Sequence, residues 1–278
     1  MMLLVDYSSM LYRAYHSTPK TVAWHGVYGC LNMLTRIVLD RRPSGLVMGV
    51  DDDWRPRFRT DALPTYKAHR VSDEPDPVTP HEILGRQILA ACGVPVIGCS
   101  GYEAEDIIAT LAKGPGPFEI LSGDRDLFAL VHDPAIAVLY PLKGTSDLLR
   151  VDEAEVTRRY GIPGRAYGDF ALLRGDPSDG LPGVPGIGEK TASQLIARYG
   201  SLDALLAATD LAPTVARKLQ AAAHYLAAAR QVVLPRTDVP LAPDVNTTLM
   251  PPSDALLDLA VQHSLETPVT RFMNALRG

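Results

Sequence analysis

The sequence has few aromatic residues, few cysteines and no long apolar run. Aromatic side chains make up 6% of its 278 residues, so aliphatic side chains have to fill most of the core. The three cysteines are odd in number and form no CxxC pair, which argues against a disulfide framework or a zinc knuckle. No run spans a bilayer, and the N-terminus lacks the cationic region of a signal peptide. We therefore expect a protein of a reducing compartment, the cytoplasm, with no membrane contact.

The sequence also lacks an excess of basic charge. Its 27 Lys and Arg face 32 Asp and Glu, for a formal net charge of −5, which is not typical of a nucleic-acid-binding protein. Nine of these acids, named below, are expected in one site, and without them 23 acids remain against 27 bases. The rest of the surface is then mildly basic, at about +4, and this combination suits a phosphodiester substrate.

Short apolar runs rich in β-branched residues alternate with helical spacing in the first half of the chain. The runs lie at 3–5, 46–50, 94–97, 118–121 and 136–140, and helical spacing lies at 27–39, 81–91 and 105–112. This alternation predicts an α/β fold built on a parallel sheet. After about residue 150, helical segments with Gly and Pro punctuation predict a second part that is entirely helical.

A long connection with little apolar periodicity occupies residues 51–81. Connections of this length are more often functional than ordinary turns. Its basic residues include Arg55, Arg57, Arg59, Lys67 and Arg70. We expect this basic segment to face a phosphodiester, with Arg59 in contact with DNA; the alternative is an ordinary solvated loop.

Nine acidic residues follow predicted strands or open predicted helices and turns. They are Asp6, Asp51, Glu103, Glu105, Asp106, Asp124, Asp126, Asp176 and Asp179. Ligands of open parallel sheets bind at the carboxyl ends of the strands, so we expect most of these side chains to meet there. Crowded carboxylates need counter-charge, and an oxygen-only set suits Mg²⁺ or Mn²⁺ better than zinc. Taken alone, each acid is also explained as a helix cap, a helix-dipole partner or a turn residue.

The segment LPGVPGIGEKT at 181–191 is rich in glycine and proline. It is not a Walker A loop, because Glu189 separates the last glycine from Lys190. We interpret it as a hairpin between two helices, where Gly186 and Gly188 let backbone N–H groups approach a DNA phosphate and Lys190 supports the contact. The alternative is a plain helix–helix connection.

Five motifs, in order, resemble those of the 5′ nucleases, meaning the 5′–3′ exonuclease domain of bacterial DNA polymerase I and the flap endonucleases. They are LLVDYSSMLYRAYH from Leu3, GVDDDWRPRFRTDALPTYKAHR from Gly49, GYEAEDIIATLA from Gly101, LSGDRDLFALV from Leu121 and GDPSDGLPGVPGIGEKTA from Gly175. The resemblance implies a PIN-like nuclease core at 1–170 with an arch at about 53–82, and a helix–three-turn–helix DNA-binding part at 171–278.

The resemblance also implies roles for individual residues. All nine acids fall on the family's metal-site positions, for two or more Mg²⁺ or Mn²⁺ ions. Tyr66, Lys67 and Arg70 fall on catalytic positions, the tyrosine at the base of the arch and the two cations at the scissile phosphate. The carbonyl groups expected to hold a K⁺ ion against the duplex backbone belong to Gly183, Val184 and Ile187. The sequence departs from the family at Glu105, which replaces Asp, at Tyr7, which replaces a small residue, and at Gly180, which replaces Asn.

The implied activity is that of a structure-specific 5′ nuclease, a 5′–3′ exonuclease and 5′-flap endonuclease. It would hydrolyse DNA phosphodiesters by a two-metal mechanism in replication and repair. The expected partner is branched or nicked double-stranded DNA with a 5′ single strand, and the arch is expected to order on it. DNA polymerase and ligase are expected as functional partners of a bacterial, nucleoid-associated monomer, either stand-alone or excised from a larger protein.

Two other functions were weighed against this one. A toxin-like ribonuclease shares the sheet and the acids, but the C-terminal helical hairpin disfavours it. A non-catalytic DNA-junction-binding module would keep the fold for recognition alone, and the complete set of acids disfavours that.

Overall fold

A six-stranded sheet forms the centre of the protein. The structure is a computed structural model that describes residues 1–143, 147–242 and 245–278. Within these ranges the strand order is β3-β2-β1-β4-β5-β6. The strands are β1 (Met2–Asp6), β2 (Gly45–Gly49), β3 (Val96–Ile97), β4 (Phe118–Leu121), β5 (Ile136–Lys143) and β6 (Asp147–Val151). The first five pair in parallel, which confirms the α/β fold that the sequence predicts.

The edge strand β6 is not predicted by the sequence analysis, and it runs antiparallel to β5. Its first four side chains are partly or fully exposed, and Val151 at its end is buried. An edge strand with so little buried surface gives a weak apolar signal in the sequence.

The two faces of the sheet carry two hydrophobic cores. Side chains alternate along a strand, so Leu4 and Val47 belong to one core and Leu3 and Leu46 to the other. The first core includes residues of α5 (Ala104–Leu111), α6 (Glu153–Tyr160), α7 (Tyr167–Arg174), α8 (Glu189–Tyr199), α9 (Leu202–Ala207), α10 (Pro213–Ala221) and α11 (Ala223–Val233). The second includes residues of α1 (Tyr7–Ser17), α2 (His25–Arg41), α4 (Thr79–Ala91), α12 (Leu256–Gln262) and α13 (Glu266–Arg277).

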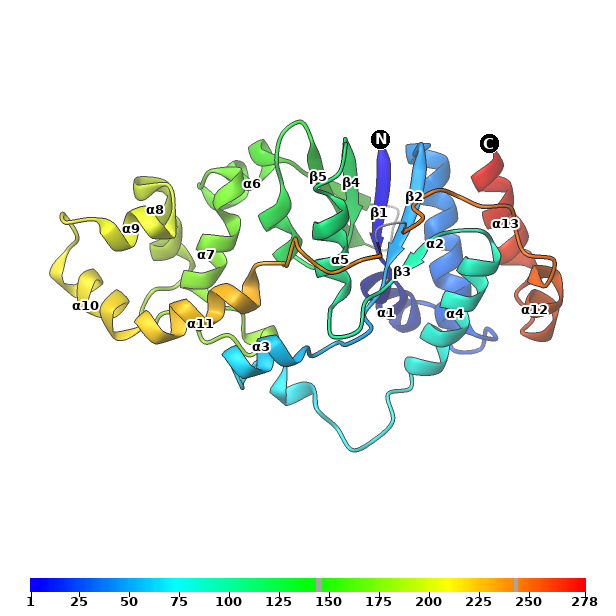
Figure 1. Cartoon of the computed structure of the whole chain (residues 1–278), viewed down its shortest axis with the longest axis horizontal. Helices are drawn as coiled ribbons and strands as arrows, with labels where there is room; N and C mark the ends of the chain where they lie inside the picture. Colours follow the sequence, from blue (N-terminus) through cyan, green and yellow to red (C-terminus); the bar gives the residue numbers. More distant parts are fainter. Residues whose placement is uncertain (144–146, 243–244) are drawn as a thin grey trace.

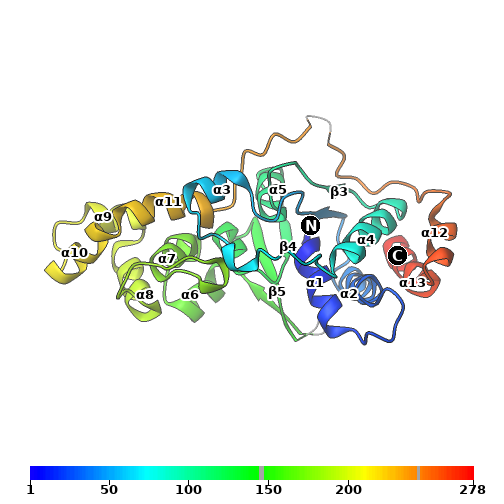
Figure 2. The same cartoon turned by 90° about the horizontal axis from the view of Figure 1, so that it is seen from below.

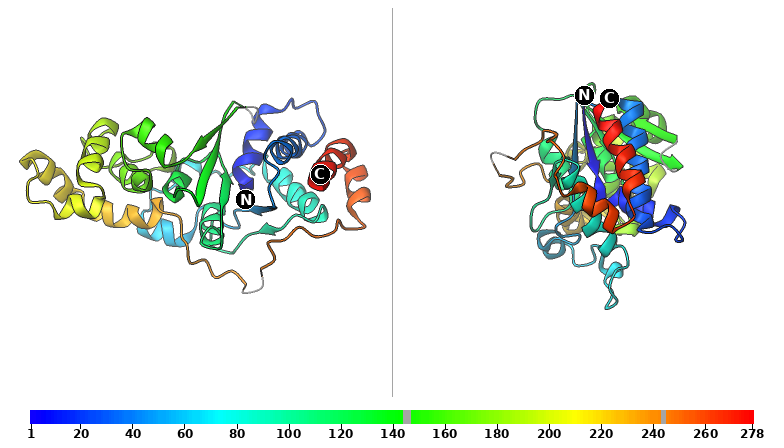
Figure 3. Two further views of the ribbon diagram at one scale, coloured as in Figure 1. Left: turned by 90° about the horizontal axis from the view of Figure 1, so that it is seen from above. Right: turned by 90° about the vertical axis from the view of Figure 1, so that its right-hand side faces the viewer.

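The last two helices lie on the opposite side of the sheet from α8–α11 (Figures 1 and 3). Helix α13 packs along α2, and its Phe272 is fully buried in the second core. The sequence predicts one helical part at residues 171–278. Helices α12 and α13 instead pack into the second core, against the helices that cover the sheet. The division near residue 170 stays a prediction. Among the described residues, no helix combines the length and apolar character that a bilayer crossing requires.

The long connection passes below the carboxyl ends of the strands (Figures 1 and 2). It contains α3 (Arg57–Ala62), which packs against α11, and a 3-10 turn at Ala68–Arg70. Further 3-10 turns lie at Asp126–Leu130, Gly164–Ala166 and Pro177–Asp179. The long connection therefore links two regions, the carboxyl ends of the strands and the helical part. In parallel sheets, the carboxyl ends are where ligands bind.

Candidate active site

The parallel register brings the ends of the central strands to one edge of the sheet. Asp6 ends β1 in register with Gly49, the last residue of β2, and β4 ends alongside β1. Asp51 and Asp124, which follow β2 and β4, therefore emerge near Asp6. Burial raises the pKa of Asp6 to about 7, and the charges of Asp51 and Asp124 add to the increase. The structure therefore brings Asp6, Asp51 and Asp124 to one edge of the sheet, and their role as metal ligands stays a prediction.

Asp6 and Asp51 also organise the backbone around them. Asp6 accepts a hydrogen bond from the Ser9 N–H at 3.0 Å, as the cap of α1, and another from the Ser122 hydroxyl at 2.6 Å. Asp51 accepts one from the Ala104 N–H at 2.7 Å, which joins the end of β2 to the first turn of α5. Capping thus fixes the direction of both carboxyl groups.

One arginine faces all three acids at the start of α5. Arg59 of α3 is fully buried and pairs with Glu103, Glu105 and Asp106, which we call the arginine-bound acids. Burial lowers the pKa of the guanidinium, but the three carboxylates outweigh it and raise the pKa overall. The sequence analysis predicts a DNA contact for Arg59; the structure contradicts it, because no part of the residue reaches the surface.

Tyr66 and Lys67, at the base of the predicted arch, converge on Glu103. The Tyr66 hydroxyl donates to one Glu103 oxygen at 2.8 Å, and the Lys67 ammonium donates to the other. The same ammonium lies 4.9 Å from the centroid of the Tyr66 ring. Burial lowers the pKa of Lys67, but Glu103, Asp179 and Glu105 raise it more, so the side chain stays charged beside the acids.

The predicted arch base is also tied to the turn that carries Asp179. Arg70 donates to Asp179 at 2.6 Å, and the backbone N–H of Lys67 donates to the Asp179 carbonyl at 2.9 Å. At Gly180, φ is 74°, and a Cβ there would lie 2.2 Å from the Thr65 carbonyl oxygen. The departure from Asn at position 180 is thus explained by the close approach of the arch base.

The remaining acids have fewer bonded cations. In the described part of the chain, Asp6, Asp51, Asp124 and Asp126 form no ion pair, and we call these four the open acids. Burial and the charges of Asp124, Asp179 and Asp176 raise the pKa of Asp126 well above its ordinary value. Asp176 lies 3.6 Å from Arg174.

The carboxylates do not already surround a metal position. Across the described ranges, no group of three His, Cys, Asp or Glu side chains has the geometry to hold an ion in common. Several of the nine acids instead bond to Arg59, Lys67 and Arg70. The edge thus brings the acids near one another, while buried and half-buried cations neutralise part of the set.

The Gly-rich hairpin leads directly into α8. A Cβ built at Gly188, the residue before the helix, would meet nothing within 4 Å, so the backbone there is open to approach. Gly186 has φ of 75°, and its carbonyl accepts a hydrogen bond from the Lys218 ammonium at 2.7 Å. The carbonyl of Val184 accepts one from the Ile187 N–H at 2.9 Å. Two carbonyls of this turn are therefore already bonded.

Tyr7, the departure after the first acid, packs beneath α4. Its hydroxyl is buried and has no hydrogen-bond partner among the described residues. A Cβ at Gly85 would lie 1.8 Å from this hydroxyl oxygen. The larger side chain at position 7 is thus accommodated by the absence of one at position 85.

Two groups that hold the acids were not predicted. Ser122 bonds Asp6, and its place directly after a strand and before Gly-Asp is the sequence signal that could have indicated it. Arg86 of α4 donates to the Asp51 carbonyl at 2.5 Å and to Glu82 at 2.6 Å. Here the signal is the i,i+4 pair of Glu82 and Arg86 on a predicted helix.

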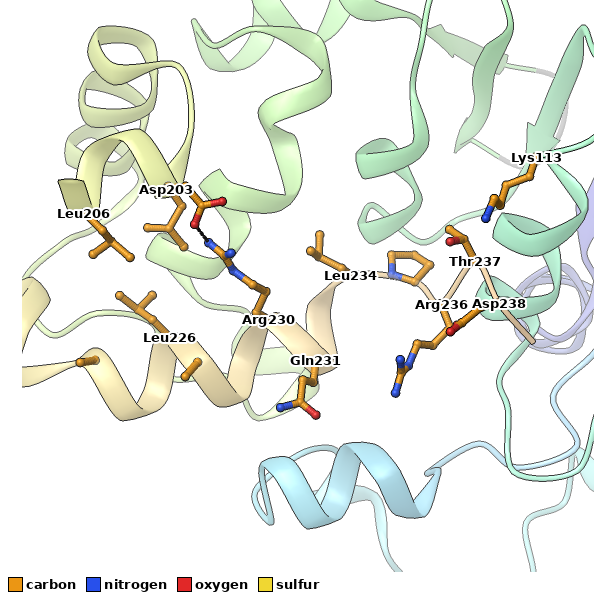
Figure 4. A pocket seen from close by; sticks show the side chains of 14 residues that line it. Lys113, Asp203, Leu206, Leu226, Arg230, Gln231, Leu234, Arg236, Thr237 and Asp238 are labelled. Atoms are coloured by element: carbon orange, nitrogen blue, oxygen red, sulfur yellow. Dashed lines mark hydrogen bonds and ion pairs between the residues drawn. The ribbon is translucent and has the colours of Figure 1, made fainter. Parts of the chain in front are cut away.

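A cavity of about 1000 Å³ lies between α9, α11 and residues 234–238 (Figure 4). Its lining includes Leu206, Leu226 and Leu234, together with Arg230, which pairs with Asp203 at 2.7 Å. None of the nine acids lines it.

The sequence matches two family models that adjoin one another. Residues 1–161 match the 5′-3′ exonuclease N-terminal resolvase-like domain, and residues 162–255 match the 5′-3′ exonuclease C-terminal SAM fold. A 5′-3′ exonuclease of Streptomyces coelicolor is 44% identical over 99% of each chain. One of Mycobacterium tuberculosis is 38% identical over 99% of this chain and 97% of its own. DNA polymerase I of the latter organism is 38% identical over 91% of this chain and 29% of its own length.

Solved structures share the fold at lower identity. The bacteriophage T5 flap endonuclease, in complex with DNA and metal ions, superposes with a TM-score of 0.67 at 15% identity over 100% of this chain and 99% of its own. Human GEN1 with Holliday junction DNA gives 0.65 at 18% identity over 99% and 71%. The catalytic core of Rad2 with DNA substrate gives 0.60 at 19% identity over 99% and 90%.

Proposed function

Because the chain belongs to the 5′-3′ exonuclease family, we propose that it is a structure-specific 5′ nuclease that hydrolyses DNA phosphodiesters. Its substrate is branched or nicked double-stranded DNA with a 5′ single strand, cut as a 5′–3′ exonuclease and as a flap endonuclease. One observation carries the proposal. Acids that follow separate strands emerge at the carboxyl ends of those strands, beneath a segment that presents Lys67 and Arg70.

The acids at this edge fit divalent metal ions by their chemistry. They are carboxylates without His or Cys, a donor set that suits Mg²⁺ or Mn²⁺. The open acids would hold such ions, with support from Asp176 and Asp179. Bound there, the ions would supply an activated water and charge to stabilise the leaving oxygen. This chain positions the carboxyl groups through the caps at Asp6 and Asp51.

Lys67 and Arg70 serve the scissile phosphate in this proposal. Both already bond acids of the site, and Arg70 keeps 42% of its side chain exposed. On substrate binding, a phosphate replaces the carboxylate as partner, and the two cations stabilise the charge that develops on its oxygens. Tyr66 fixes the direction of Glu103 through its buried hydroxyl.

The helical part holds the duplex. The open backbone at Gly188 approaches a phosphate, Gly186 gives the turn its positive φ beside it, and the exposed Lys190 in the first turn of α8 adds charge. Carbonyl groups of Gly183, Val184 and Ile187 are the proposed K⁺ ligands in this hairpin. The nuclease core at 1–170 and the DNA-binding part from 171 are the proposed functional division, apart from α12 and α13.

A labelled flap substrate tests the proposal. The purified chain is incubated with a double-flap duplex, labelled at the 5′ end, in K⁺ with EDTA, Mg²⁺ or Mn²⁺, and every product is mapped. We expect metal-dependent release of the flap near the junction, and its loss in Asp124→Asn. Tight binding without cleavage under any metal would contradict the proposal and favour a junction-binding module of the same fold.

Processing of flaps places the protein beside two other activities in replication and repair. The flap must be produced by strand displacement, which is the work of a DNA polymerase, and the nick that remains must be sealed by a ligase. Both are proposed as functional partners of a monomer that works on the bacterial nucleoid. Sizing the chain by light scattering with and without flap DNA tests the monomer.

A further inference from the structure

Every N–H donor of Arg59 has an acceptor. A guanidinium has five donors in a fixed plane. The Arg59 Nε donates to the Val232 carbonyl at 3.1 Å, Nη1 donates to Glu103 and Asp106, and Nη2 donates to Glu105 and Asp106. The residue has no exposed surface. A buried guanidinium with all its donors used is fixed in position.

Asp106 is saturated in the same way. A carboxylate offers about four lone-pair sites. Asp106 accepts two hydrogen bonds from Arg59, each at 2.8 Å, one from the Arg236 N–H at 2.7 Å and one from the Glu103 N–H at 3.2 Å. It is also fully buried. No lone pair of Asp106 is left for a metal ion unless one of these four hydrogen bonds is broken.

Asp126 offers a contrast within the same site. It also comes from a segment that follows a strand and is nearly buried. Among the described residues, no ion pair holds its carboxyl group, and the charges of Asp124, Asp179 and Asp176 each act on it more strongly than that of Arg174. A carboxyl group surrounded by like charges gains from a bound cation, whereas one already paired with a guanidinium does not.

The bonds of Arg59 also connect three parts of the fold. The arginine belongs to α3 of the predicted arch, its carboxylate partners to the start of α5, and Val232 to α11 of the helical part. The Arg236 guanidinium lies 5.0 Å from the ring of Phe58, beside Arg59. The place of the acids at α5 therefore depends on how the arch base and the helical part sit.

We propose that Asp106 is the counter-ion of Arg59 and not a metal ligand, and that Arg59 is a positioning residue. Through Asp106 it holds Glu103 and Glu105 in place and couples the site to α3 and α11. The inference rests on the proposed metal-dependent nuclease function. It corrects the expectation that all nine acids bind metal, and it gives Arg59 a role inside the protein in place of a DNA contact.

Metal binding without DNA gives the first test. Free Mn²⁺ is followed by electron paramagnetic resonance as the full chain, Asp106→Asn and Asp126→Asn are titrated. We expect Asp106→Asn to keep the number of bound ions, with an affinity change of about tenfold at most, as for a group outside the ligand shell. Asp126→Asn is expected to lose at least one ion. Loss of an ion from Asp106→Asn would overturn the proposal.

A double-mutant cycle needs neither metal nor cleavage. Urea unfolding in EDTA is measured for Arg59→Gln, Asp106→Asn and the double variant. Each single variant raises the equilibrium constant of unfolding by some factor. If the two residues are partners, the factor for the double variant is smaller than the product of the two single factors by at least about tenfold. Independent effects would contradict the pairing. The exposed pair Arg57 and Asp61, on the same helix, is the matched control and is expected to show no coupling of this size.

The role of Arg59 is tested by separating binding from rate. Arg59→Lys keeps the charge but loses the planar fork. We expect a single-turnover rate at least about tenfold lower, with flap-DNA affinity within about twofold of wild type, because the side chain is not exposed. Arg36→Gln, at an exposed position of α2 outside the site, is the surface control. Weaker DNA binding with an unchanged single-turnover rate would restore the DNA contact and overturn the positioning role. A wild-type chain that binds no Mn²⁺ and cuts no DNA would refute the proposed function, while the cycle would still decide the pairing.

Discussion

The arginine-bound acids and the open acids lie at one edge of one sheet, yet their surroundings differ. Arg59 and Lys67 bond the first group, while the open acids, in the described part of the chain, have carboxylates and hydrogen-bond donors around them but no paired cation. Carboxyl groups at one edge of the sheet therefore fall into two classes, with a different role proposed for each. In our proposal, those with a protein cation maintain the architecture of the site, and those without one bind a cation from solution.

If the proposal holds, the number of acids in the motifs exceeds the number of metal ligands. Nine carboxylates would suggest a heavily charged pocket, but one guanidinium neutralises much of the cluster at α5. The comparison also explains how Glu105 is tolerated where the resemblance implies Asp. Its longer side chain reaches the Arg59 guanidinium.

The largest difference is expected in cleavage by two Asn variants. Asp126→Asn removes an open acid, and we expect its single-turnover rate on flap DNA in Mg²⁺ to fall by at least about 1000-fold. Asp106→Asn removes a counter-ion, and we expect a smaller loss of about 10- to 100-fold. Equal losses would break the distinction between the two groups. DNA binding, measured in Ca²⁺, is the control for folding.

Removing the lysine that bonds Glu103 gives the next effect. Lys67→Ala is expected to lower the single-turnover rate about 100-fold, because one cation at the phosphate is lost. Duplex affinity is expected to change little. Lys190→Ala, in the hairpin, should do the opposite and weaken binding. The role of Lys67 is refuted if its variant binds poorly but turns over at the normal rate.

The open acids also predict how stability depends on pH. The pKa of Asp6 rises from 3.8 to about 7 on folding, so the folded chain binds this proton more tightly than the unfolded chain. Its contribution is complete below about pH 4 and is lost as the pH rises through 7. In EDTA we expect Tm to fall by roughly 5 °C from pH 5 to pH 8, and less in Mg²⁺.

A variant and a scan check this assignment. Asp6→Asn cannot titrate, so its Tm should vary less over the same range in EDTA. A wild-type Tm that is flat or rises between pH 5 and pH 8, in the absence of metal, would show that the open acids are neutralised by some other group.

The smallest effect concerns a side chain within the arginine-bound group. Glu105→Asp shortens the reach to Arg59, which keeps Glu103 and Asp106, so we expect a loss of about 1 kcal/mol in unfolding free energy. Urea unfolding in EDTA measures it. Asp61→Asn, in an exposed ion pair, should cost less. A gain in stability from the shorter side chain would place Glu105 outside the group.

The strands and the acids at their ends could be predicted from the sequence, because buried parallel strands are short apolar runs and the residue after each run lies at one edge. The direction in which Arg59 points could not. A basic residue in a six-residue helix gives no periodic signal of burial, and its partners at 103–106 lie more than forty residues away. Sequence position alone indicated a surface cation.

The return of the C-terminal helices to the sheet was equally hidden. Helix α13 is amphipathic, with Val269 and Phe272 buried, but such a pattern fits any apolar surface. Which core it joins is decided by the route of the chain after α11. That information lies in residues 234–242 and 245–255, which form neither helix nor strand and have no periodicity of their own.

The packing of Tyr7 on Gly85 constrains the order in which the two positions can change. With the tyrosine present, any side chain at position 85 would overlap its hydroxyl oxygen, whereas a small residue at position 7 leaves only unfilled space beside the glycine. The order of substitution is therefore fixed when both residues change. Tyr7 has to be replaced by a smaller residue before Gly85 can be replaced by a larger one. In an ancestor with a side chain at position 85, the glycine has to appear before the tyrosine.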